Sequence, residues 1–347
     1  MNILFLIGNG FDLNIGLNTR FQNALSYYLK KSNNNPRTQK FKKDIDKNFE
    51  KWSDFENQMG IYTKEFTPKN VDDYCFCIRD FRESLVEHLK NEELRINYDT
   101  QKEAIVSVFR KSIINFYENL VPASLNALRA LTNQKNEAIY YNFITFNYTN
   151  VIDKCIEIIK HGNSPFNSRK NGNHTLNDTI NQILHIHGTT QNNVIMGVDN
   201  AEQIVNTELS KNTKLARTII KPVINEKLKN LNDRTGISII NNSNIICVFG
   251  LSLGETDKTW WKIIGEWLKK GNNQLVIFDI VPQWNPIHPE DSIEIIDALI
   301  EKFCAAAGIK PESSLTDKIH IGFNTNLFKI NLTNQSIQEN DTVSVLA

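Results

Sequence analysis

Four short apolar runs in the sequence each end in polar or glycine residues that could bind a nucleotide or transfer a proton. These segments are residues 8–12 (GNGFD), 145–149 (TFNYT), 185–188 (HIHG) and 250–253 (GLSL). Apolar runs that end in a turn are typical of strands buried on both faces of a parallel sheet. Because parallel strands end at the same edge of a sheet, we expect the four segments to line one crevice.

The turn after the first run is a candidate nucleotide-binding segment. Gly8 and Gly10 permit a positive φ and a close approach of the backbone to a pyrophosphate, and the amide groups of the helix that follows would point at the anion. Asn9, Phe11 and Asp12 complete this segment. The third glycine of the usual dinucleotide fingerprint is missing, so a tight strand-to-helix turn without a ligand is the alternative interpretation.

Asn147 and His187 are the candidate catalytic residues. The Asn147 amide offers a donor and an acceptor, so it could bind ribose hydroxyls or hold a water beside a glycosidic carbon. A neutral His187 imidazole could act as a general base near physiological pH. The alternatives are a helix cap for Asn147 and a structural imidazole for His187. His185 points to the opposite face of the same strand, so we interpret it as a residue of the core or of the layer behind the site.

Thr145, Gly250, Ser252 and Asp279 are also assigned to nucleotide binding, because each lies at the end of a predicted strand. Gly250 and Ser252 could close over the adenosine or the phosphates, and Asp279 could accept hydrogen bonds from the adenosine ribose. Ordinary turn chemistry is the alternative for these three residues. Asp257 precedes a helical pattern, so we interpret its carboxylate as stabilising the amino end of that helix.

The elements that must position these residues follow the pattern of an α/β protein. Predicted strands alternate with helical patterns, and each strand ends in a turn, which specifies a doubly wound parallel sheet. A polar stretch at residues 163–177 is predicted to be a linker. The predicted strands are residues 2–7, 138–146, 183–188, 194–198, 244–249 and 275–279.

The distribution of helical patterns predicts how the chain is divided. Residues 19–137 consist of long polar segments with helical spacing, which indicates a large helical insertion after the first strand. The nucleotide-binding core then comprises residues 1–18 and 138–310. Residues 311–347 are predicted to form a small hairpin, at 318–332, and a disordered tail.

Composition excludes several classes of protein. Lys plus Arg and Asp plus Glu balance at 39 each in 347 residues, so there is no global positive field, and nucleic acid is not an expected partner. No apolar stretch resembles a signal peptide or reaches membrane length. The five cysteines include no CxxC pair, which argues against a disulfide framework and a zinc site. We therefore expect a cytoplasmic protein that binds neither membranes nor a metal.

The order of several motifs resembles a known family. ILFLIGNGFDLNIGL, WSDFE, TFNYT, HIHG, IMGVD and FGLSLGETDKTWW occur in this order between Ile3 and about Asp279. This set resembles the AbiH family of bacterial abortive-infection proteins. It is more distantly similar to sirtuins and to sirtuin-like defence enzymes that cleave NAD. The resemblance implies a sirtuin-like Rossmann core and a role in defence against phage.

The sirtuin resemblance also implies roles for single residues. It makes Asn147 the residue that positions ribose and water, and His187 the catalytic histidine. The two nucleotide-binding turns that it implies contain Gly8 with Gly10 and Gly250 with Ser252. The sequence departs from the pattern at Thr149, where sirtuins usually carry an acid that helps bind nicotinamide, and at Asn18, where a proline is common. The zinc-binding cysteines are missing as well, which argues against protein deacylation.

These observations lead to a first hypothesis in which NAD is the substrate. Its pyrophosphate would lie on the Gly8 to Gly10 turn and its nicotinamide ribose between Asn147 and His187. The glycosidic bond would break through an oxocarbenium-like state, because nicotinamide is a good leaving group and a shielded site holds the sugar in a reactive pose. The products would be nicotinamide and ADP-ribose, and the loss of NAD would arrest an infected cell.

Two other functions remain open at this point. The chain could be a non-catalytic sensor that binds a nucleotide and uses the helical insertion to engage a phage component or its own copies. A nuclease ranks lowest, because no acidic metal-binding cluster or basic run stands out. An active NAD hydrolase would have to be restrained until a phage-derived trigger arrives, either by a closed insertion or by assembly into a homo-oligomer.

Overall fold

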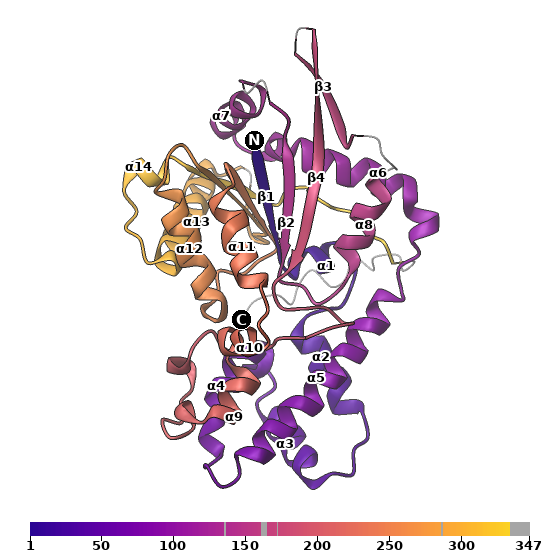
Figure 1. The fold of residues 1–347 in the computed structure, drawn as a ribbon, viewed down its shortest axis with the longest axis vertical. Helices are drawn as coiled ribbons and strands as arrows, with labels where there is room; N and C mark the ends of the chain where they lie inside the picture. The colour runs from indigo at the N-terminus through magenta and orange to yellow at the C-terminus, as the bar shows by residue number, and fades with distance from the viewer. Residues whose placement is uncertain (135–136, 161–164, 172, 286, 334–347) are drawn as a thin grey trace.

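The computed structural model describes residues 1–134, 137–160, 165–171, 173–285 and 287–333. Its centre is a seven-stranded sheet in the order β3-β4-β2-β1-β5-β6-β7, in which every described pair is parallel except β3 with β4 (Figure 1). The expectation of an α/β protein with a mostly parallel sheet is confirmed. The strands are β1 (Asn2–Ile7), β2 (Tyr140–Thr145), β3 (Asn167–Asn171), β4 (His174–His185), β5 (Ile245–Phe249), β6 (Gln274–Asp279) and β7 (Ile319–Phe323).

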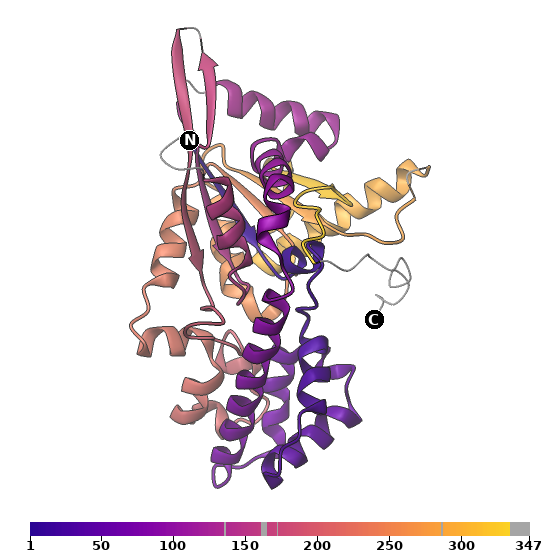
Figure 2. The same ribbon diagram turned by 90° about the vertical axis from the view of Figure 1, so that its right-hand side faces the viewer.

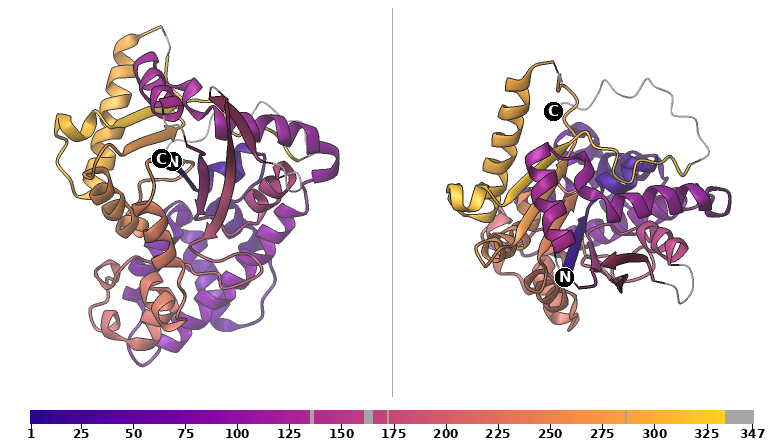
Figure 3. Two further views of the ribbon diagram at one scale, coloured as in Figure 1. Left: turned by 45° about the horizontal axis from the view of Figure 1, so that its top comes forward. Right: turned by 90° about the horizontal axis from the view of Figure 1, so that it is seen from above.

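Helices cover both faces of the sheet (Figure 3). Ile3, Phe5 and Ile7 of the central strand pack on one face, and Leu4 and Leu6 pack on the other, because successive side chains of a strand alternate in direction. The first face is covered by α1 (Gly10–Asn14), α6 (Tyr98–Ile114), α7 (Pro122–Gln134) and α8 (Val151–Ile159). The second is covered by α11 (Asn232–Asn241), α12 (Lys258–Leu268) and α13 (Pro289–Ala307), and the short α14 (Ser313–Thr316) precedes β7.

A second group of helices, which we call the helical cluster, lies beyond the ends of the strands (Figures 1 and 2). Its core is rich in aromatic side chains, including Phe55 and Phe81, whose ring centroids stack 4.0 Å apart. The cluster consists of α2 (Phe21–Lys30), α3 (Pro36–Lys47), α4 (Phe55–Tyr62), α5 (Val71–Glu93) and α9 (Thr213–Ile219), and α10 (Lys221–Lys227) follows it. Short 3-10 helices are Lys51–Ser53, Thr63–Glu65, Phe116–Asn119, Ala201–Gln203, Leu209–Lys211 and Glu255–Asp257.

The helices that pack on the sheet and those that form the helical cluster do not follow the predicted boundaries of the insertion. Helices α6 and α7 fall within the predicted insertion, residues 19–137, yet they pack on the sheet. Met196, Val198 and Leu215, from a later part of the chain, are buried in the helical cluster. The cluster is therefore completed by a segment that lies more than one hundred residues further along the sequence.

The sequence predicts neither a disulfide framework nor a segment that crosses a membrane, and the structure describes both the cysteines and the helices concerned. The five cysteine side chains are free and buried. Among the described residues, no helix combines the length and the apolar character that are needed to cross a membrane.

The predicted linker at residues 163–177 is wrong where the structure describes it. It contains β3 and the start of β4, which form an antiparallel hairpin. Of the predicted strand 183–188, residues 183–185 are the end of β4 and residues 186–188 form no strand. The hairpin is anchored by the buried Asp178, whose carboxylate accepts hydrogen bonds from the Ile139 amide (2.8 Å) and from Arg169 (Nε, 2.8 Å). Many of its side chains are exposed, so an extended backbone leaves no apolar run in the sequence.

Two other predicted strands are also wrong. Residues 194–198 form no strand, and their apolar character reflects burial of Met196 and Val198 in the helical cluster. The expected terminal hairpin at 318–332 is instead β7, which pairs in parallel with β6 at the edge of the sheet. The predicted tail beyond residue 333 lies outside the described residues.

The ends of β1 and β5 make a close backbone contact that only glycine permits. The Gly8 amide donates to the Phe249 carbonyl (3.0 Å), and the Gly10 amide donates to the Gly250 carbonyl (2.8 Å). A Cβ atom on Gly10 would lie 2.5 Å from the Gly250 Cα, and Gly250 itself has a φ of 67°. These glycines are thus required to bring two strand ends together.

This contact predicts that Gly10→Ala destabilises the fold. The added methyl group has to displace backbone, and we expect a loss of about 2 kcal/mol in the free energy of unfolding, measured by urea denaturation. Gly254→Ala is the matched control, since its Cβ would meet no atom closer than 3.4 Å. Equal stability of the two variants would contradict the proposed contact.

Candidate functional site

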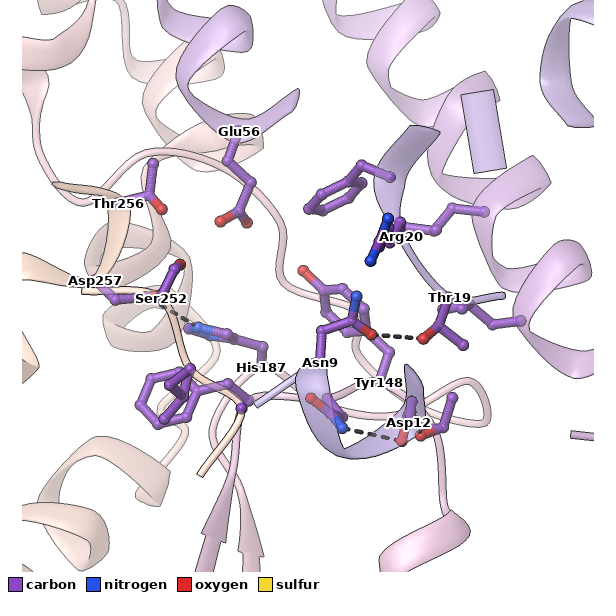
Figure 4. A pocket seen from close by; sticks show the side chains of 18 of the residues that line it. Asn9, Asp12, Thr19, Arg20, Glu56, Tyr148, His187, Ser252, Thr256 and Asp257 are labelled. Atoms are coloured by element: carbon purple, nitrogen blue, oxygen red, sulfur yellow. Dashed lines mark hydrogen bonds and ion pairs between the residues drawn. The ribbon is translucent and has the colours of Figure 1, made fainter. Parts of the chain in front are cut away.

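A cavity of about 540 Å³ lies between the carboxyl ends of the strands and the helical cluster (Figure 4). The sheet contributes the turns after β1, β2, β4 and β5, and the helical region contributes the segment before α2 and the start of α4. A volume of this size is within the usual range for small-molecule sites. Figure 4 shows Glu56, Thr256 and Asp257 toward one end of the cavity and Thr19, Arg20 and Asp12 toward the other.

The cavity brings together six of the residues that the sequence analysis assigned to the site. They come from four strand ends that are far apart in the sequence, as expected for a parallel sheet. These residues are Asn9, Asp12, Asn147, His187, Gly250 and Ser252.

The structure places the other five outside the cavity lining. Phe11 is fully buried in the core, where its ring contacts Phe109 and Phe328. The Thr145 hydroxyl accepts a hydrogen bond from the backbone amide of Asn147 (3.1 Å), so it stabilises the turn after β2. Asp279 is exposed, and its carboxylate accepts from the neighbouring Ile280 amide.

Gly8 and Gly10 likewise do not line the cavity, and the Gly10 amide is already paired with Gly250. The Phe11 amide donates to the Gly8 carbonyl (2.9 Å), so it too has a partner within the turn. Neither the Gly10 amide nor the Phe11 amide is therefore free for the predicted pyrophosphate contact. Both glycines take part in the contact between β1 and β5.

Asp12 is a buried carboxyl group that orients two polar side chains of the turn after β2. It is 1% exposed, and its two oxygens accept hydrogen bonds from the Asn147 amide nitrogen Nδ2 (3.0 Å) and the Thr149 hydroxyl (2.7 Å). Burial raises the pKa of Asp12 to about 7, although these two donors favour the ionised form. The carboxyl group and its two donors hold the Asn147 side chain in one orientation.

Two buried polar atoms beside the cavity have no hydrogen-bond partner among the described residues. Because Nδ2 of Asn147 is bound to Asp12, its Oδ1 is left buried and unpaired. His187 contacts Asp257 through Nε2 (3.1 Å), and its other ring nitrogen, Nδ1, is buried without a partner. Buried polar atoms are rarely left unsatisfied, so unpaired atoms beside a cavity indicate a place for a ligand or water.

His185 supports the turn from behind. Its Nδ1 lies 3.1 Å from the Asn147 carbonyl oxygen, and its Nε2 lies 2.8 Å from Asp153 Oδ2 on α8. His185 does not line the cavity. The interpretation of His185 as a residue behind the site thus agrees with its contacts.

Sequence reasoning missed the charged group that holds Asp257. The ammonium group of Lys221 is buried and lies 2.9 Å from Asp257 Oδ1 and 3.0 Å from Glu56 Oε2. Asp257 stands at the amino end of α12, where the interpretation from sequence places it, but its side chain makes no capping hydrogen bond there. No motif marks Lys221, because only its burial distinguishes it from the many surface lysines.

Arg20 was also missed. It is exposed at the cavity rim, and it forms no ion pair with the described acidic residues. Its neighbour Thr19 donates a hydrogen bond to Asn9 Oδ1 (2.6 Å), which ties this segment to the turn after β1.

Within the part of the chain that the structure describes, no group of three or more His, Cys, Asp or Glu side chains is arranged to hold a metal ion.

The raised pKa of Asp12 predicts a pH-dependent stability. Between about pH 4 and pH 7 the folded protein keeps a proton on Asp12 that the unfolded chain has released, so the free energy of unfolding falls as pH rises through this window. Asp12→Asn removes the titration. Relative to this variant, we expect the wild type to lose on the order of 4 kcal/mol across the window, as measured by urea unfolding.

Asp279→Asn, at an exposed carboxyl away from the cavity, is the control for Asp12→Asn. A stability difference between wild type and Asp12→Asn that does not change with pH would show that Asp12 ionises normally.

Comparison with known proteins provides an independent assignment. The family model described as "Bacteriophage abortive infection AbiH" matches residues 4–279, which is most of the chain. The matched range contains every strand turn that lines the cavity. No curated protein matches the chain. The chain therefore belongs to the AbiH family of bacteriophage abortive-infection proteins.

Proposed function

We propose that this phage-defence protein binds NAD in the cavity and hydrolyses it to nicotinamide and ADP-ribose in the cytoplasm. Loss of NAD would then arrest the infected cell. The observation that carries the proposal is the pair of unpaired acceptors, Asn147 Oδ1 and His187 Nδ1, which both belong to residues of one cavity. Hydrolysis of an N-glycosidic bond needs acceptors of this kind, to orient a water and to take its proton.

The arrangement of His187 supports a role as general base. An ionised carboxylate is an acceptor only, so Asp257 binds the protonated Nε2 and leaves the lone pair of Nδ1 free. Nδ1 would take a proton from water or a ribose hydroxyl as water adds to the anomeric carbon and nicotinamide leaves with the electron pair of the broken C–N bond. Asn147 Oδ1 would hold the water or hydroxyl in place.

Arg20 is the residue that we assign to the phosphates. The amides of Gly10 and Phe11 are used within the protein, whereas the guanidinium of Arg20 is a cation at the rim of the same cavity. Arginine binds phosphate oxygens in pairs, and this would orient NAD with its nicotinamide ribose near His187. The finer fold assignment, a sirtuin-like doubly wound Rossmann core, belongs to the same proposal, and helices on both sheet faces support it.

The first prediction of this proposal concerns turnover. We expect His187→Gln and Asn147→Ala each to lower kcat for NAD cleavage about 100-fold, since general-base catalysis contributes at least this factor. The measurement is chromatography of nicotinamide and ADP-ribose, with and without phage lysate as a source of the trigger. Full turnover by His187→Gln would exclude His187 as the base. Saturable binding of NAD without products in the wild type would favour a nucleotide sensor instead.

A second prediction separates Arg20 from Asp279. Arg20→Met removes a charge-assisted contact to phosphate, so we expect KM for NAD to rise about 10-fold with kcat little changed. Asp279→Ala should leave KM unchanged, because Asp279 lies off the cavity. The measurement is steady-state kinetics of the two variants. A raised KM in Asp279→Ala with an unchanged KM in Arg20→Met would indicate instead that the adenosine ribose binds at Asp279, at the end of β6.

A further inference from the structure

We propose that Lys221 is a positioning residue for His187, and that it acts by letting Asp257 stay ionised beside a neutral imidazole whose Nδ1 is unprotonated. Four charged or titratable side chains form a continuous line from the helical cluster to the reaction site. Glu56 Oε2 lies 3.0 Å from Lys221 Nζ, which lies 2.9 Å from Asp257 Oδ1, and Asp257 Oδ1 lies 3.1 Å from His187 Nε2. We call these four residues the charge line.

The charge line explains three motifs for which the proposed reaction by itself has no use. Glu56 belongs to WSDFE, and its second oxygen, Oε1, accepts from the amide of Gly197 in IMGVD (2.9 Å). The Val198 carbonyl, in the same motif, accepts from the Lys221 amide (3.0 Å). Asp257 belongs to GETDKTWW. Three motifs far apart in the sequence thus hold one ammonium group in place.

The backbone at Gly197 shows how closely this arrangement is packed. Gly197 has a φ of 150°, and a Cβ atom there would lie 1.9 Å from the Ile219 carbonyl oxygen. A side chain at this position would displace the residues that lead into Lys221. The glycine therefore serves the placement of the lysine.

Charge balance is the physical reason for the assignment. With the imidazole neutral, Glu56, Lys221 and Asp257 carry one net negative charge in a buried site. Burial opposes ionisation of Asp257, but Lys221 and then His187 keep its pKa below the ordinary value. Without Lys221 the buried charge would be twice as negative, and one group would have to take up a proton.

Glu56 keeps a donor, the Gly197 amide, which favours its ionised form, so we expect the proton on the imidazole or on Asp257. Either of these two sites removes the free acceptor. If the proton goes to the imidazole, both ring nitrogens carry hydrogen. If it goes to Asp257, the carboxyl group donates to Nε2 and the ring proton moves to Nδ1. Asp233 on α11, bound by Asn225 (2.9 Å), also interacts electrostatically with His187, and it adds to the negative surroundings. Lys221 is thus required for an unprotonated Nδ1.

The test uses the full chain and a spectroscopic readout that does not depend on turnover. Histidine is labelled with ¹⁵N, and the His187 signals are assigned by their loss in His187→Gln. An unprotonated ring nitrogen resonates far from a protonated one, so the spectrum at about pH 8 reports the state of Nδ1. The variants are Lys221→Met, Glu56→Gln, and both substitutions together. Lys214→Met, at an exposed ion pair with Asp72, is the matched control.

The variants are expected to differ in the protonation state of Nδ1. Nδ1 becomes protonated in Lys221→Met, and it stays unprotonated in Glu56→Gln and in the control. It becomes unprotonated again in the double variant, which has the same net charge as the wild type at this site. The kinetic readout rests on the proposed function: kcat for NAD cleavage falls about 100-fold in Lys221→Met and recovers to within about 10-fold in the double variant.

A purely structural role for Lys221 predicts the opposite of the rescue, because a second substitution would then add to the damage. An unprotonated Nδ1 in Lys221→Met, or a protonated Nδ1 in the double variant, would overturn the inference. If Lys221→Met is too unstable to purify, the double variant and Glu56→Gln decide, since both must keep Nδ1 unprotonated. Absence of NAD cleavage in the wild type would contradict the proposed function. The role of Lys221 would still be tested by the spectroscopic result.

Discussion

The buried ammonium group of Lys221 is the interaction on which the site depends most. It joins Glu56 of the helical cluster to Asp257 at the end of the sheet, and both contacts are 3.0 Å or shorter. Removing a charge from water is costly, and the two carboxylates compensate for the hydration that Lys221 loses. The helical cluster is thereby fixed over the strand ends, and the space between them is the cavity.

A second buried titratable group lies on the other side of the cavity. Asp12 is held by Asn147 and Thr149, and burial keeps its pKa near neutrality. The two buried groups have a common consequence: each fixes one polar side chain of the strand turns and leaves one polar atom of that side chain unpaired. Asn147 is fixed through Asp12, and His187 is fixed through Asp257 and Lys221. A site with fixed acceptors costs little reorganisation when a ligand arrives.

The family assignment and the cavity support the same biological role from different directions. Membership of the AbiH family places the protein in abortive infection, and the matched region spans the strands and the helical cluster that enclose the cavity. The residues proposed for chemistry come from the strand turns, whereas Glu56 and Arg20 come from the region between β1 and β2. Any movement of the helical cluster relative to the sheet would separate Lys221 from Asp257 and change the surroundings of His187.

The sequence by itself determined the buried strands and the edge at which the polar residues meet. Residues 3–7, 245–249 and 275–278 are apolar throughout because both faces of these strands are covered, and such runs can be recognised without a structure. The parallel arrangement then brought Asn9, Asp12, Asn147 and His187 to one cavity. The exposed hairpin of β3 and β4 gave no comparable signal, because polar strands lack the apolar run that marks burial.

Only the tertiary structure decided what the polar groups bind. Gly10 has the residue type of a nucleotide loop, but its amide is paired with Gly250, which lies beside it only after β1 and β5 have paired. Lys221 and Glu56 are 165 residues apart in sequence, and no local pattern relates them. Residue types and spacing reflect burial and backbone conformation, which are local properties. The partner of a charge depends on which distant segments pack within about 3 Å of it, and the whole fold determines that.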